Sequence, residues 1–286
     1  MNHQSIKSSN NDSIEITEFH ASSSNGKVII FNNAAAVNRA QYFRLASFLT
    51  QYGFHCICWN YPGTNDNELH SSKFNSYSIN DWGFRHFHSI LDHALTKFPG
   101  FGIYLFAHSI GGILPGLCSN HSAIKGMIGY GVQTAYWKDW KFPEKVGHVF
   151  VWNFILPMIA RLWKLFPNLL KKQRPKLPLQ YILHWSKRWR QSSILDLFEQ
   201  HNYHPIFFQD LNFPIIHINA EDDPIATPKA VERFNSLVPN CPTKEIWIVP
   251  SEIGVKKIGH VGLVKTKCKD KIWKEIPKYI EELDRI

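Results

Sequence analysis

Ser109 stands between a run of apolar residues and a pair of glycines, in the stretch YLFAHSIGGIL that begins at Tyr104. The pattern A-H-S-I-G, with small residues two positions before and after the serine, is typical of a nucleophile elbow between a strand and a helix. The tight turn excludes large side chains at Ala107 and Gly111. It raises the serine above the strand ends and places the N–H of Ile110 at a helix N-terminus, where developing negative charge is stabilised. An ordinary glycine-rich turn would show the same pattern.

A nucleophilic serine needs a general base, and the base needs a carboxylate that orients it. Downstream of Ser109, IIHINAEDDPIATP places Asp222 and Asp223 just past a predicted strand, and IGHVGLV places His260 between small residues. We favour Asp223 as the acid because it lies at the turn out of the strand, three residues after Ala220, and Asp222 is the alternative. A helix-capping carboxylate and a surface histidine are each common. The order Ser, Asp, His, with each residue at a strand end, predicts a catalytic triad.

The loop FNNAAAVN, at the end of the predicted strand 27–33, consists mainly of small residues that let the backbone approach a substrate oxygen. We expect the N–H of Ala34 to be the second donor to an oxyanion, beside that of Ile110, with Ala35 as the alternative. A tight loop between a strand and a helix, with no such role, would have the same sequence.

Strand-like and helix-like segments alternate along most of the chain. Apolar runs predict strands, and apolar spacings of three and four residues with capping residues predict helices. The predicted strands are 27–33, 54–63, 102–107, 124–132, 213–223 and 244–250, and the predicted helices are 40–53, 79–99, 228–239, one that starts at about 110 and one that starts at about 270. This alternation predicts an α/β protein with a mainly parallel central sheet flanked by helices.

The alternation breaks between residues 133 and 212, which predicts an inserted helical cap. From 133 to 206 there are twelve Lys and Arg residues against four Asp and Glu, and six of the ten tryptophans. A basic, aromatic segment fits an anionic substrate, lipid head groups or nucleic acid, and also a cap with an apolar underside and a solvated upper face. Pro157 and Arg161 interrupt its apolar stretch 146–163, so we expect a helix packed over the sheet rather than a membrane span.

The predicted organisation is a flexible N-terminus with a possible first strand (1–26), a core formed by 27–132 and 213–286, and a basic, Trp-rich helical cap (133–212). The first residues lack the apolar segment of a signal peptide, and the five cysteines have no metal or redox spacing. These features predict a cytoplasmic protein with reduced cysteines. We expect no cofactor and no metal, because His86 and His88 in RHFHSILDH are two residues apart and cannot share a helix face.

Taken together, these stretches resemble the α/β-hydrolase superfamily, and within it a group of bacterial serine hydrolases related to serine aminopeptidases and monoglyceride lipases. The resemblance runs from about residue 27 to the C-terminus. The oxyanion strand, loop and helix of that superfamily are similar to IIFNNAAAVNRAQYFRLASFLTQYGF, and the segment after the next strand is similar to CWNYPGTNDN. The elbow is similar to FAHSIGG, the acid loop to AEDDPIATP and the histidine loop to KKIGHVGLV. A basic cap helix is similar to HWSKRWRQ. The resemblance implies the α/β-hydrolase fold and a serine hydrolase activity.

The chain departs from the usual pattern of that superfamily at several positions. Asn32 and Asn33 stand where many members have His-Gly, Pro62 and Thr64 where Arg and Gly are usual, Asp66 where Ser is usual, and Ala107 at the first elbow glycine. None of these departures removes the triad. They bear on the geometry of the oxyanion donors and on any substrate contact inferred from the resemblance.

We therefore expect a serine hydrolase that cleaves a carboxylic ester, acyl or lipid-like, through Ser109, Asp223 and His260 and an acyl-enzyme. The expected partners are a small-molecule or lipid ester and, through the basic cap, a peripheral membrane contact; no nucleic acid is expected, because no nucleic-acid motif accompanies the basic segment. Two alternatives stay open: a non-catalytic α/β-hydrolase scaffold that binds a lipid or a protein, and an acyltransferase with the same triad. The candidate substrate-binding residues are His108, Trp152, Phe154 and Met158.

Overall fold

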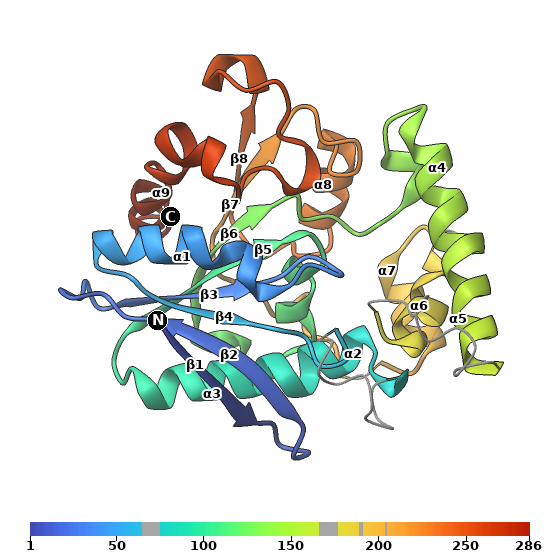
Figure 1. Ribbon diagram of the computed structural model, residues 1–286, viewed down its shortest axis with the longest axis horizontal. Helices are drawn as coiled ribbons and strands as arrows, with labels where there is room; N and C mark the ends of the chain where they lie inside the picture. The colour runs from blue at the N-terminus through green and yellow to red at the C-terminus, as the bar shows by residue number, and fades with distance from the viewer. Residues whose placement is uncertain (65–74, 166–176, 189–190, 204) are drawn as a thin grey trace.

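The computed structural model describes residues 1–64, 75–165, 177–188, 191–203 and 205–286 (Figure 1). Eight strands in these ranges form one sheet in the order β1-β2-β4-β3-β5-β6-β7-β8. Strand β2 is antiparallel to β1 and to β4, and the other neighbours are parallel, so the predicted mainly parallel sheet is confirmed. The strands are β1 Asn2–Lys7, β2 Ser13–Phe19, β3 Lys27–Asn32, β4 His55–Trp59, β5 Gly102–His108, β6 Ile124–Tyr130, β7 Ile215–Ala220 and β8 Thr243–Ile248.

Helices cover both faces of this sheet. Residues of α1 and α9 pack on one face, and residues of α3 and α8 pack on the other (Figure 1). The helices are α1 Phe43–Leu49, α2 Ile79–Asp81, α3 His88–Lys97, α4 Glu144–Phe150, α5 Leu156–Leu165, α6 Leu179–Trp185, α7 Ile194–Gln200, α8 Pro228–Asn235 and α9 Ile276–Leu283.

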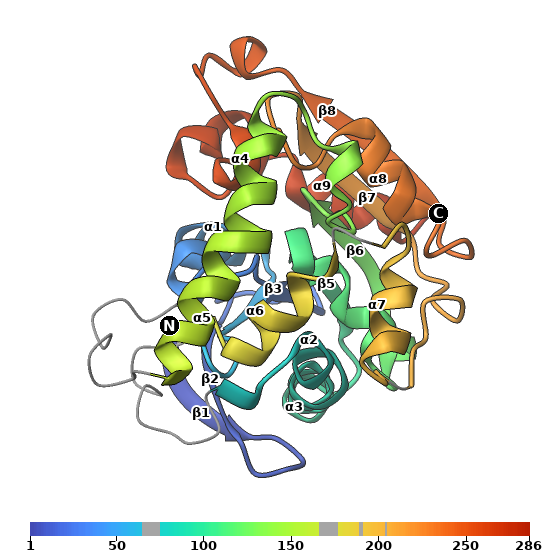
Figure 2. The same cartoon turned by 90° about the vertical axis from the view of Figure 1, so that its right-hand side faces the viewer.

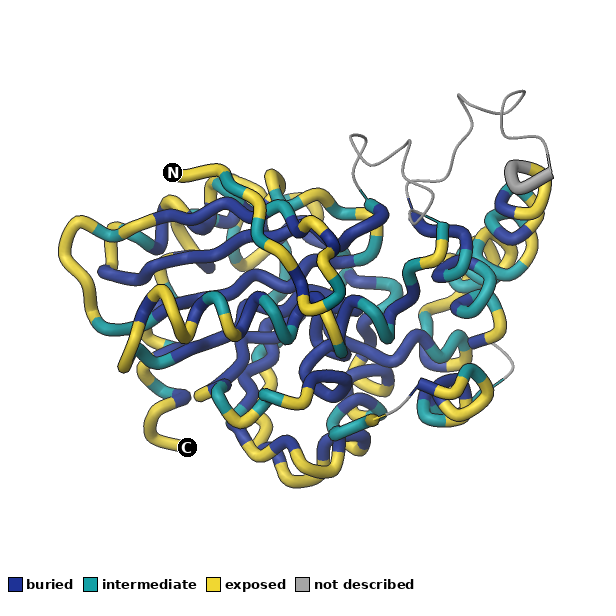
Figure 3. Tube along the Cα trace, turned by 90° about the horizontal axis from the view of Figure 1, so that it is seen from below, coloured by how far each residue is buried: buried dark blue, intermediate teal, exposed yellow. Residues whose placement is uncertain are grey.

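The central strand β3 shows how the sequence divides between two buried layers. Val28 and Ile30 belong to the core that includes α3, whereas Ile29 and Phe31 belong to the core that includes α1. Successive side chains of a strand point to opposite faces, and a parallel strand covered on both sides has no solvent face. This is why β3 is a continuous apolar run, and Figure 3 shows the resulting buried centre of the molecule.

The N-terminal segment 1–26, expected to be flexible with a possible first strand, contains two strands. It forms β1 and β2, which pair in register from Asn2 opposite Glu18 to Lys7 opposite Ser13. Strand β2 also pairs with β4, and Ile14 and Ile16 are buried. The first residues are polar because β1 is an exposed edge strand, and such a strand can be polar without being unstructured.

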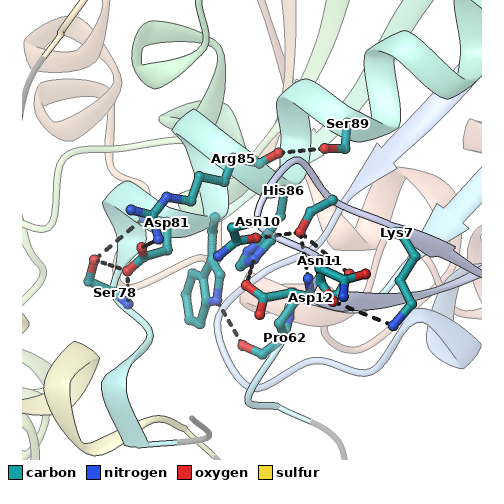
Figure 4. A network of polar contacts seen from close by, with 12 residues as sticks. Lys7, Asn10, Asn11, Asp12, Pro62, Ser78, Asp81, Arg85, His86 and Ser89 are labelled. Atoms are coloured by element: carbon teal, nitrogen blue, oxygen red, sulfur yellow. Dashed lines mark hydrogen bonds and ion pairs between the residues drawn. The ribbon is translucent and has the colours of Figure 1, made fainter.

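The predicted helix 79–99 is formed, with a π-helical turn from Trp82 to Phe87 between α2 and α3. A capping box starts it: the Asp81 N–H donates to the Ser78 hydroxyl at 3.4 Å, and the Ser78 N–H donates to the Asp81 carboxylate at 2.9 Å. Figure 4 shows this start of the helix beside the turn after β1.

Histidines on this helix pair with carboxylates of the N-terminal hairpin. His86 Nε2 lies 3.0 Å from Oδ2 of Asp12 (Figure 4), and His93 Nε2 lies 2.7 Å from Oε1 of Glu18. Both carboxylates are buried. The histidine-rich stretch RHFHSILDH therefore fastens the helix to β2 and to the turn that precedes it.

The α-helix expected after Ser109 is replaced by two short 3-10 turns, Ser109–Gly112 and Leu114–Leu117. Three glycines and Pro115 in this segment disfavour a regular helix. The backbone also passes close to its neighbours: a Cβ at Gly111 would lie 2.4 Å from the carbonyl oxygen of Asn32. The chain after Ser109 is thus shaped by close packing more than by helical hydrogen bonds.

The segment 133–212, here called the insert, lies beyond one end of the sheet (Figures 1 and 2). Helix α4, a π-helical turn from Val151 to Ile155 and α5 follow one another as a single long helix, and α5 packs on α6. Within the described ranges, no helix is long and apolar enough to cross a membrane. Asp66, and Trp189 and Arg190 of the stretch HWSKRWRQ, lie outside the described residues.

Candidate active site

The backbone at Ser109 has the strained geometry of a nucleophile elbow. Strand β5 ends at His108, and Ser109 follows with a φ of 54°, in the left-handed region that residues with a side chain rarely adopt. Ala107 is completely buried, and Gly111 has no room for a Cβ, so both flanking positions require small residues. The turn places Ser109 in the wall of a cavity.

His260 lies between Ser109 and Asp223. Its Nε2 is 2.9 Å from Oγ of Ser109, and its Nδ1 is 2.7 Å from Oδ2 of Asp223. The other carboxylate oxygen accepts the N–H groups of Ile225, at 2.8 Å, and Ala226, at 3.1 Å. Because Asp223 can only accept when ionised, Nδ1 carries the ring hydrogen and Nε2 is free to accept the hydrogen of the serine hydroxyl.

The pKa of Asp223 lies below its ordinary value. Burial raises this pKa, but the hydrogen bond and charge of His260, together with the N–H groups of Ile225 and Ala226, lower it by more. The carboxylate is therefore ionised at neutral pH, as the orientation of the imidazole requires.

Asp222 and Asp223 have different partners. The two carboxylate oxygens of Asp222 accept the N–H of Ile258 at 2.9 Å and the N–H of Gly259 at 2.8 Å. Asp222 thus holds the loop that carries His260, while Asp223 contacts the imidazole itself. Of the two acids that the sequence left open, the geometry favours Asp223 as the partner of His260.

Tyr130 and two glycines complete the support of the histidine loop. The Tyr130 hydroxyl bonds the carbonyl of Gly259 and accepts the N–H of Leu263 at 3.2 Å. Gly131 has a φ of 59°, and a Cβ there would lie 3.0 Å from Cε1 of His260. The loop and the end of β6 are therefore packed in direct contact.

His108, a predicted substrate-binding residue, does not line the cavity. Its ring is completely buried and stacks on Tyr130, with the centroids 4.7 Å apart. Nδ1 lies 2.8 Å from the Tyr42 hydroxyl, and Nε2 lies 2.6 Å from the carbonyl oxygen of His260. The prediction failed because His108 is still part of β5, so its side chain points to a sheet face and not past the strand end.

The protonation of His108 follows from these contacts. A carbonyl oxygen only accepts, so Nε2 carries the hydrogen and Nδ1 accepts from Tyr42. Burial, with a smaller contribution from the charge of His260, lowers the pKa of His108 to about 3. The ring is neutral and connects two backbone segments of the site.

Ala34 has a different bond from the one the sequence predicted. Its N–H donates to the Tyr42 hydroxyl at 3.0 Å, so it is not free for an oxyanion in this conformation. The next N–H, that of Ala35, has no hydrogen-bond partner among the described residues, and Ala35 and Ile110 both line the cavity. The sequence alone could not show that the Ala34 N–H is taken up by a side chain, because Tyr42 belongs to a separate segment, the turn before α1. Ala35, the alternative in the sequence analysis, is the better candidate beside Ile110.

Asn32 and Asn33, where His-Gly is usual in the superfamily, hold the same loop. Asn32 Nδ2 donates to the carbonyl of Gly111 at 3.2 Å, and its Oδ1 accepts from Nε1 of Trp59 at 3.0 Å. Asn33 Nδ2 donates to the carbonyl of Trp59 at 2.7 Å. The two amides tie the loop to the elbow and to the end of β4.

The cavity at Ser109 has a volume of about 140 Å³ and is closed partly by the insert. Its core side includes Ser109, His260 and Ile225, and its insert side includes Gln133 and Arg188. The remaining walls are largely aromatic, from Trp137, Trp140, Trp152, Tyr181 and Trp185. Sequence analysis identified only Trp152 of these insert residues. The concentration of tryptophans and the stretch HWSKRWRQ were the available signals for the others.

Trp152 lines this cavity, but Phe154 and Met158 do not. Their side chains are 54% and 50% exposed. Residues two apart on a helix do not share a face, so Phe154 points away from Trp152, and Met158, four residues further, lies on the same outer face as Phe154. The apolar composition of this helix could not reveal which face turns toward the cavity.

The whole chain is similar to solved structures of esterases and lipases. A highly thermostable carboxyl esterase from Bacillus coagulans matches with a TM-score of 0.63 and 13% identity, over 99% of this chain and 98% of that one. A soluble variant of monoglyceride lipase from Saccharomyces cerevisiae matches with a TM-score of 0.62 and 17% identity, over 99% and 96%. MenH from S. aureus matches with a TM-score of 0.56 and 17% identity, over 94% and 98%.

No protein-family model and no curated protein sequence matches the chain. The structural matches nevertheless extend over nearly the whole chain, including its mainly parallel sheet. The chain therefore has the α/β-hydrolase fold.

Proposed function

We propose that this protein is a serine hydrolase that cleaves carboxylic esters. The observation that carries the proposal is the pair of hydrogen bonds from His260 to Ser109 and to Asp223, beside a cavity with aromatic walls. Several structures with the same fold are of esterases and lipases, which is in keeping with this activity.

In the proposed reaction, Oγ of Ser109 attacks the ester carbonyl while Nε2 of His260 takes its proton. Asp223 stabilises the imidazolium, and the N–H groups of Ile110 and Ala35 bind the oxyanion. His260 then gives the proton to the leaving alcohol, and an acyl-enzyme remains. Water, deprotonated by His260, attacks this acyl group and releases the acid and the free serine. Because Ser109 begins a short 3-10 turn and no α-helix, oxyanion stabilisation rests on individual N–H groups.

Hydrolysis of p-nitrophenyl esters of increasing chain length tests the proposal. Wild type should turn over at least one ester, and Ser109→Ala and His260→Ala should each lose about 10³-fold or more of kcat. Ser122→Ala changes an exposed serine just before β6, at the opposite edge of the sheet from Ser109, so it is the matched control and should keep full activity. A Ser109→Ala protein with wild-type activity would refute the proposed mechanism.

Labelling with a serine-directed fluorophosphonate separates the alternatives. Stoichiometric labelling of wild type, absent in Ser109→Ala, supports a reactive serine whatever the substrate. Folded wild-type protein that is not labelled would favour the non-catalytic scaffold. An acyltransferase would be labelled too, but added alcohol would raise p-nitrophenol release and yield a new ester instead of the acid.

We further propose a peripheral membrane contact through the outer face of α4 and α5. Exposed apolar side chains recur every four residues there, at Val146, Phe150, Phe154, Met158 and Leu162. Cations lie along the same helices at Lys145 and Arg161, which suits a surface of anionic lipid. Cosedimentation with anionic vesicles should be strong, and weak for a Phe150→Ser, Phe154→Ser double variant, with Ser109→Ala as the control that still binds. Equal binding of the double variant would refute the contact.

A further inference from the structure

Arg188 is a buried cation in the wall of the cavity that contains Ser109. Its side chain follows α6, and the residue is only 1% exposed. Nε donates to the carbonyl of Thr134 at 2.7 Å, Nη2 donates to the hydroxyl of Thr134 at 3.3 Å, and Nη1 donates to the carbonyl of Gln191. All three acceptors are neutral. A guanidinium has five N–H donors, so two have no partner among the described residues.

The buried carboxylate in this region, that of Asp139, is paired with another arginine, Arg233. Asp139 accepts from Nε of Arg233 at 2.5 Å and from Nη2 of Arg233 at 3.2 Å. Both guanidinium groups lie close to the Tyr136 ring, Arg188 at 5.6 Å and Arg233 at 4.4 Å from its centroid. Asp139 is thus paired with Arg233 and, at 3.9 Å, with Lys229, whereas within the described ranges Arg188 forms no ion pair.

Arg188 keeps its charge in this setting. Burial, and then the positive charge of Arg233, lower its pKa to about 10, against smaller opposing contributions from acids such as Asp196 and Asp139. A charge held in a protein interior is costly unless an opposite charge compensates it. An anion in the cavity would supply that compensation.

The rest of the cavity wall fits an anion as well. None of its described lining residues is Asp or Glu. Gln133 lines the same cavity, and its Oε1 is bonded to the N–H of Ala135, which leaves its amide NH2 as a second donor. Ser109 and His260 line this cavity too, so an ester-cleaving pair and an anion-binding group face one volume of about 140 Å³.

We infer that the substrate is an ester whose acyl chain ends in a carboxylate, which Arg188 holds while Ser109 attacks the ester carbonyl. A carboxylate fits better than a phosphate monoester, because one guanidinium with two spare N–H groups matches one negative charge on two oxygens. This inference rests on the proposed function, and it names the class of substrate: half-esters of dicarboxylic acids.

Two esters of the same shape test the inference. The p-nitrophenyl half-ester of adipic acid carries a terminal carboxylate, and p-nitrophenyl 6-methylheptanoate has a neutral branched end in its place. Wild type should show a higher kcat/KM for the half-ester. Arg188→Met should lower kcat/KM for the half-ester about 10- to 100-fold, the effect of losing hydrogen bonds to a charged group, and should change the neutral ester much less. Lys187→Met, which removes an exposed cation next to Arg188 in sequence but outside this cavity, should leave the preference unchanged.

A competition experiment on wild type covers the case in which Arg188→Met does not fold. Adipate should inhibit hydrolysis of p-nitrophenyl butyrate, whereas 1,6-hexanediol at the same concentration should not. Equal kcat/KM for the two esters, together with no inhibition by adipate, would overturn the inference and leave the esterase proposal intact. Stronger inhibition by inorganic phosphate than by adipate would overturn the carboxylate assignment. Failure to hydrolyse any ester or to react with the fluorophosphonate would remove the proposed function, and this inference with it.

Discussion

The hydroxyl of Tyr42 lies 2.8 Å from Nδ1 of His108, at the centre of a hydrogen-bonded path between two loops of the site. The path begins at the N–H of Ala34, which donates to Tyr42, and ends at the carbonyl of His260, which accepts from Nε2 of His108. Every hydrogen in it has a fixed direction, because an N–H only donates and a carbonyl only accepts. The loop before α1 and the histidine loop are thus positioned by one buried connection.

Tyr42→Phe should break this connection without opening a large cavity. The change leaves the Ala34 N–H and Nδ1 of His108 without their partner, which costs about 1 to 3 kcal/mol of unfolding free energy. We expect lower stability and, for ester hydrolysis, a reduced kcat with little change in KM, because the cavity at Ser109 keeps its walls. Urea unfolding and ester kinetics measure the two effects. A variant with unchanged stability and unchanged kcat would show that the path positions nothing.

The variants Asp223→Asn and Asp222→Asn should differ sharply in the kcat that they retain. An amide at 223 presents an NH2 that favours the wrong tautomer of His260, and the analogous change in a well-studied serine protease lowers kcat about 10⁴-fold. At 222 an amide oxygen still accepts one loop N–H, so we expect a loss of about 1 to 2 kcal/mol in stability and less than about 10-fold in kcat. Comparable losses of kcat in both variants would contradict the separate roles.

Gly111→Ala should be strongly destabilising, because its Cβ would lie 2.4 Å from the carbonyl oxygen of Asn32. Overpacking of this kind typically costs about 1 to 3 kcal/mol, and backbone atoms cannot move aside as a side chain can. Gly147→Ala is the matched control: no atom lies within 4 Å of its Cβ, and it sits in α4. There alanine should stabilise the helix by about 0.5 to 1 kcal/mol. Thermal unfolding of both variants provides the comparison, and a Gly111→Ala protein as stable as wild type would contradict the packing argument.

The stability of the protein should fall as the pH drops below 6.5, the ordinary pKa of histidine. Burial lowers the pKa of His108 to about 3 and that of His217 to about 4. Between pH 6.5 and these values the unfolded chain binds protons that the folded chain does not, so stability is complete above the window and is lost as the pH falls through it. Each histidine contributes a slope of about 1.4 kcal/mol per pH unit.

Urea unfolding at about pH 7 and about pH 5 measures this slope. His217→Gln lies away from the triad, where His217 bonds Asn235, and should reduce the slope by the share of one histidine. The lowered pKa of Asp223 does not affect the slope measured between these pH values, because the stability that Asp223 contributes is lost only below the ordinary Asp pKa of 3.8. A wild-type protein equally stable at both pH values would contradict the prediction.

The sequence predicted the sheet, and the meeting of Ser109, Asp223 and His260, for one physical reason. Parallel strands place their carboxyl ends at one edge, so Ser109 after β5 and Asp223 after β7 come close even though they are far apart in the chain, and the loop that leaves β8 at the same edge carries His260. The elbow could also be predicted from the sequence, since the need for small residues at Ala107 and Gly111 is local. The N-terminal hairpin was harder to predict, because polar edge strands and flexible tails have similar compositions.

The rest of the site depends on contacts between segments that the sequence does not bring together. The bond from Ala34 to Tyr42 decides which N–H of the loop is free, and no local pattern reveals it. The rotation of the long insert helix decides that Trp152 faces the cavity and that Phe154 faces outward. Arg188 looked like one more cation of a basic segment until its burial and its neutral acceptors were known.

The histidine loop is fastened almost entirely through its main chain: Asp222 binds the N–H groups of Ile258 and Gly259, His108 binds the carbonyl of His260, and Tyr130 binds the N–H of Leu263. Main-chain atoms are the same in every residue but proline. Few side chains of the loop take part in these bonds, and exposed Lys256 and Lys257 should accept most substitutions. Ile258 and Leu263 are buried, Gly262 has no room for a Cβ, and Val261 lines the cavity at Ser109, so these positions are restricted by packing. Selection falls as well on the residues that hold the loop, which lie 36 to 152 positions away from the atoms they bind.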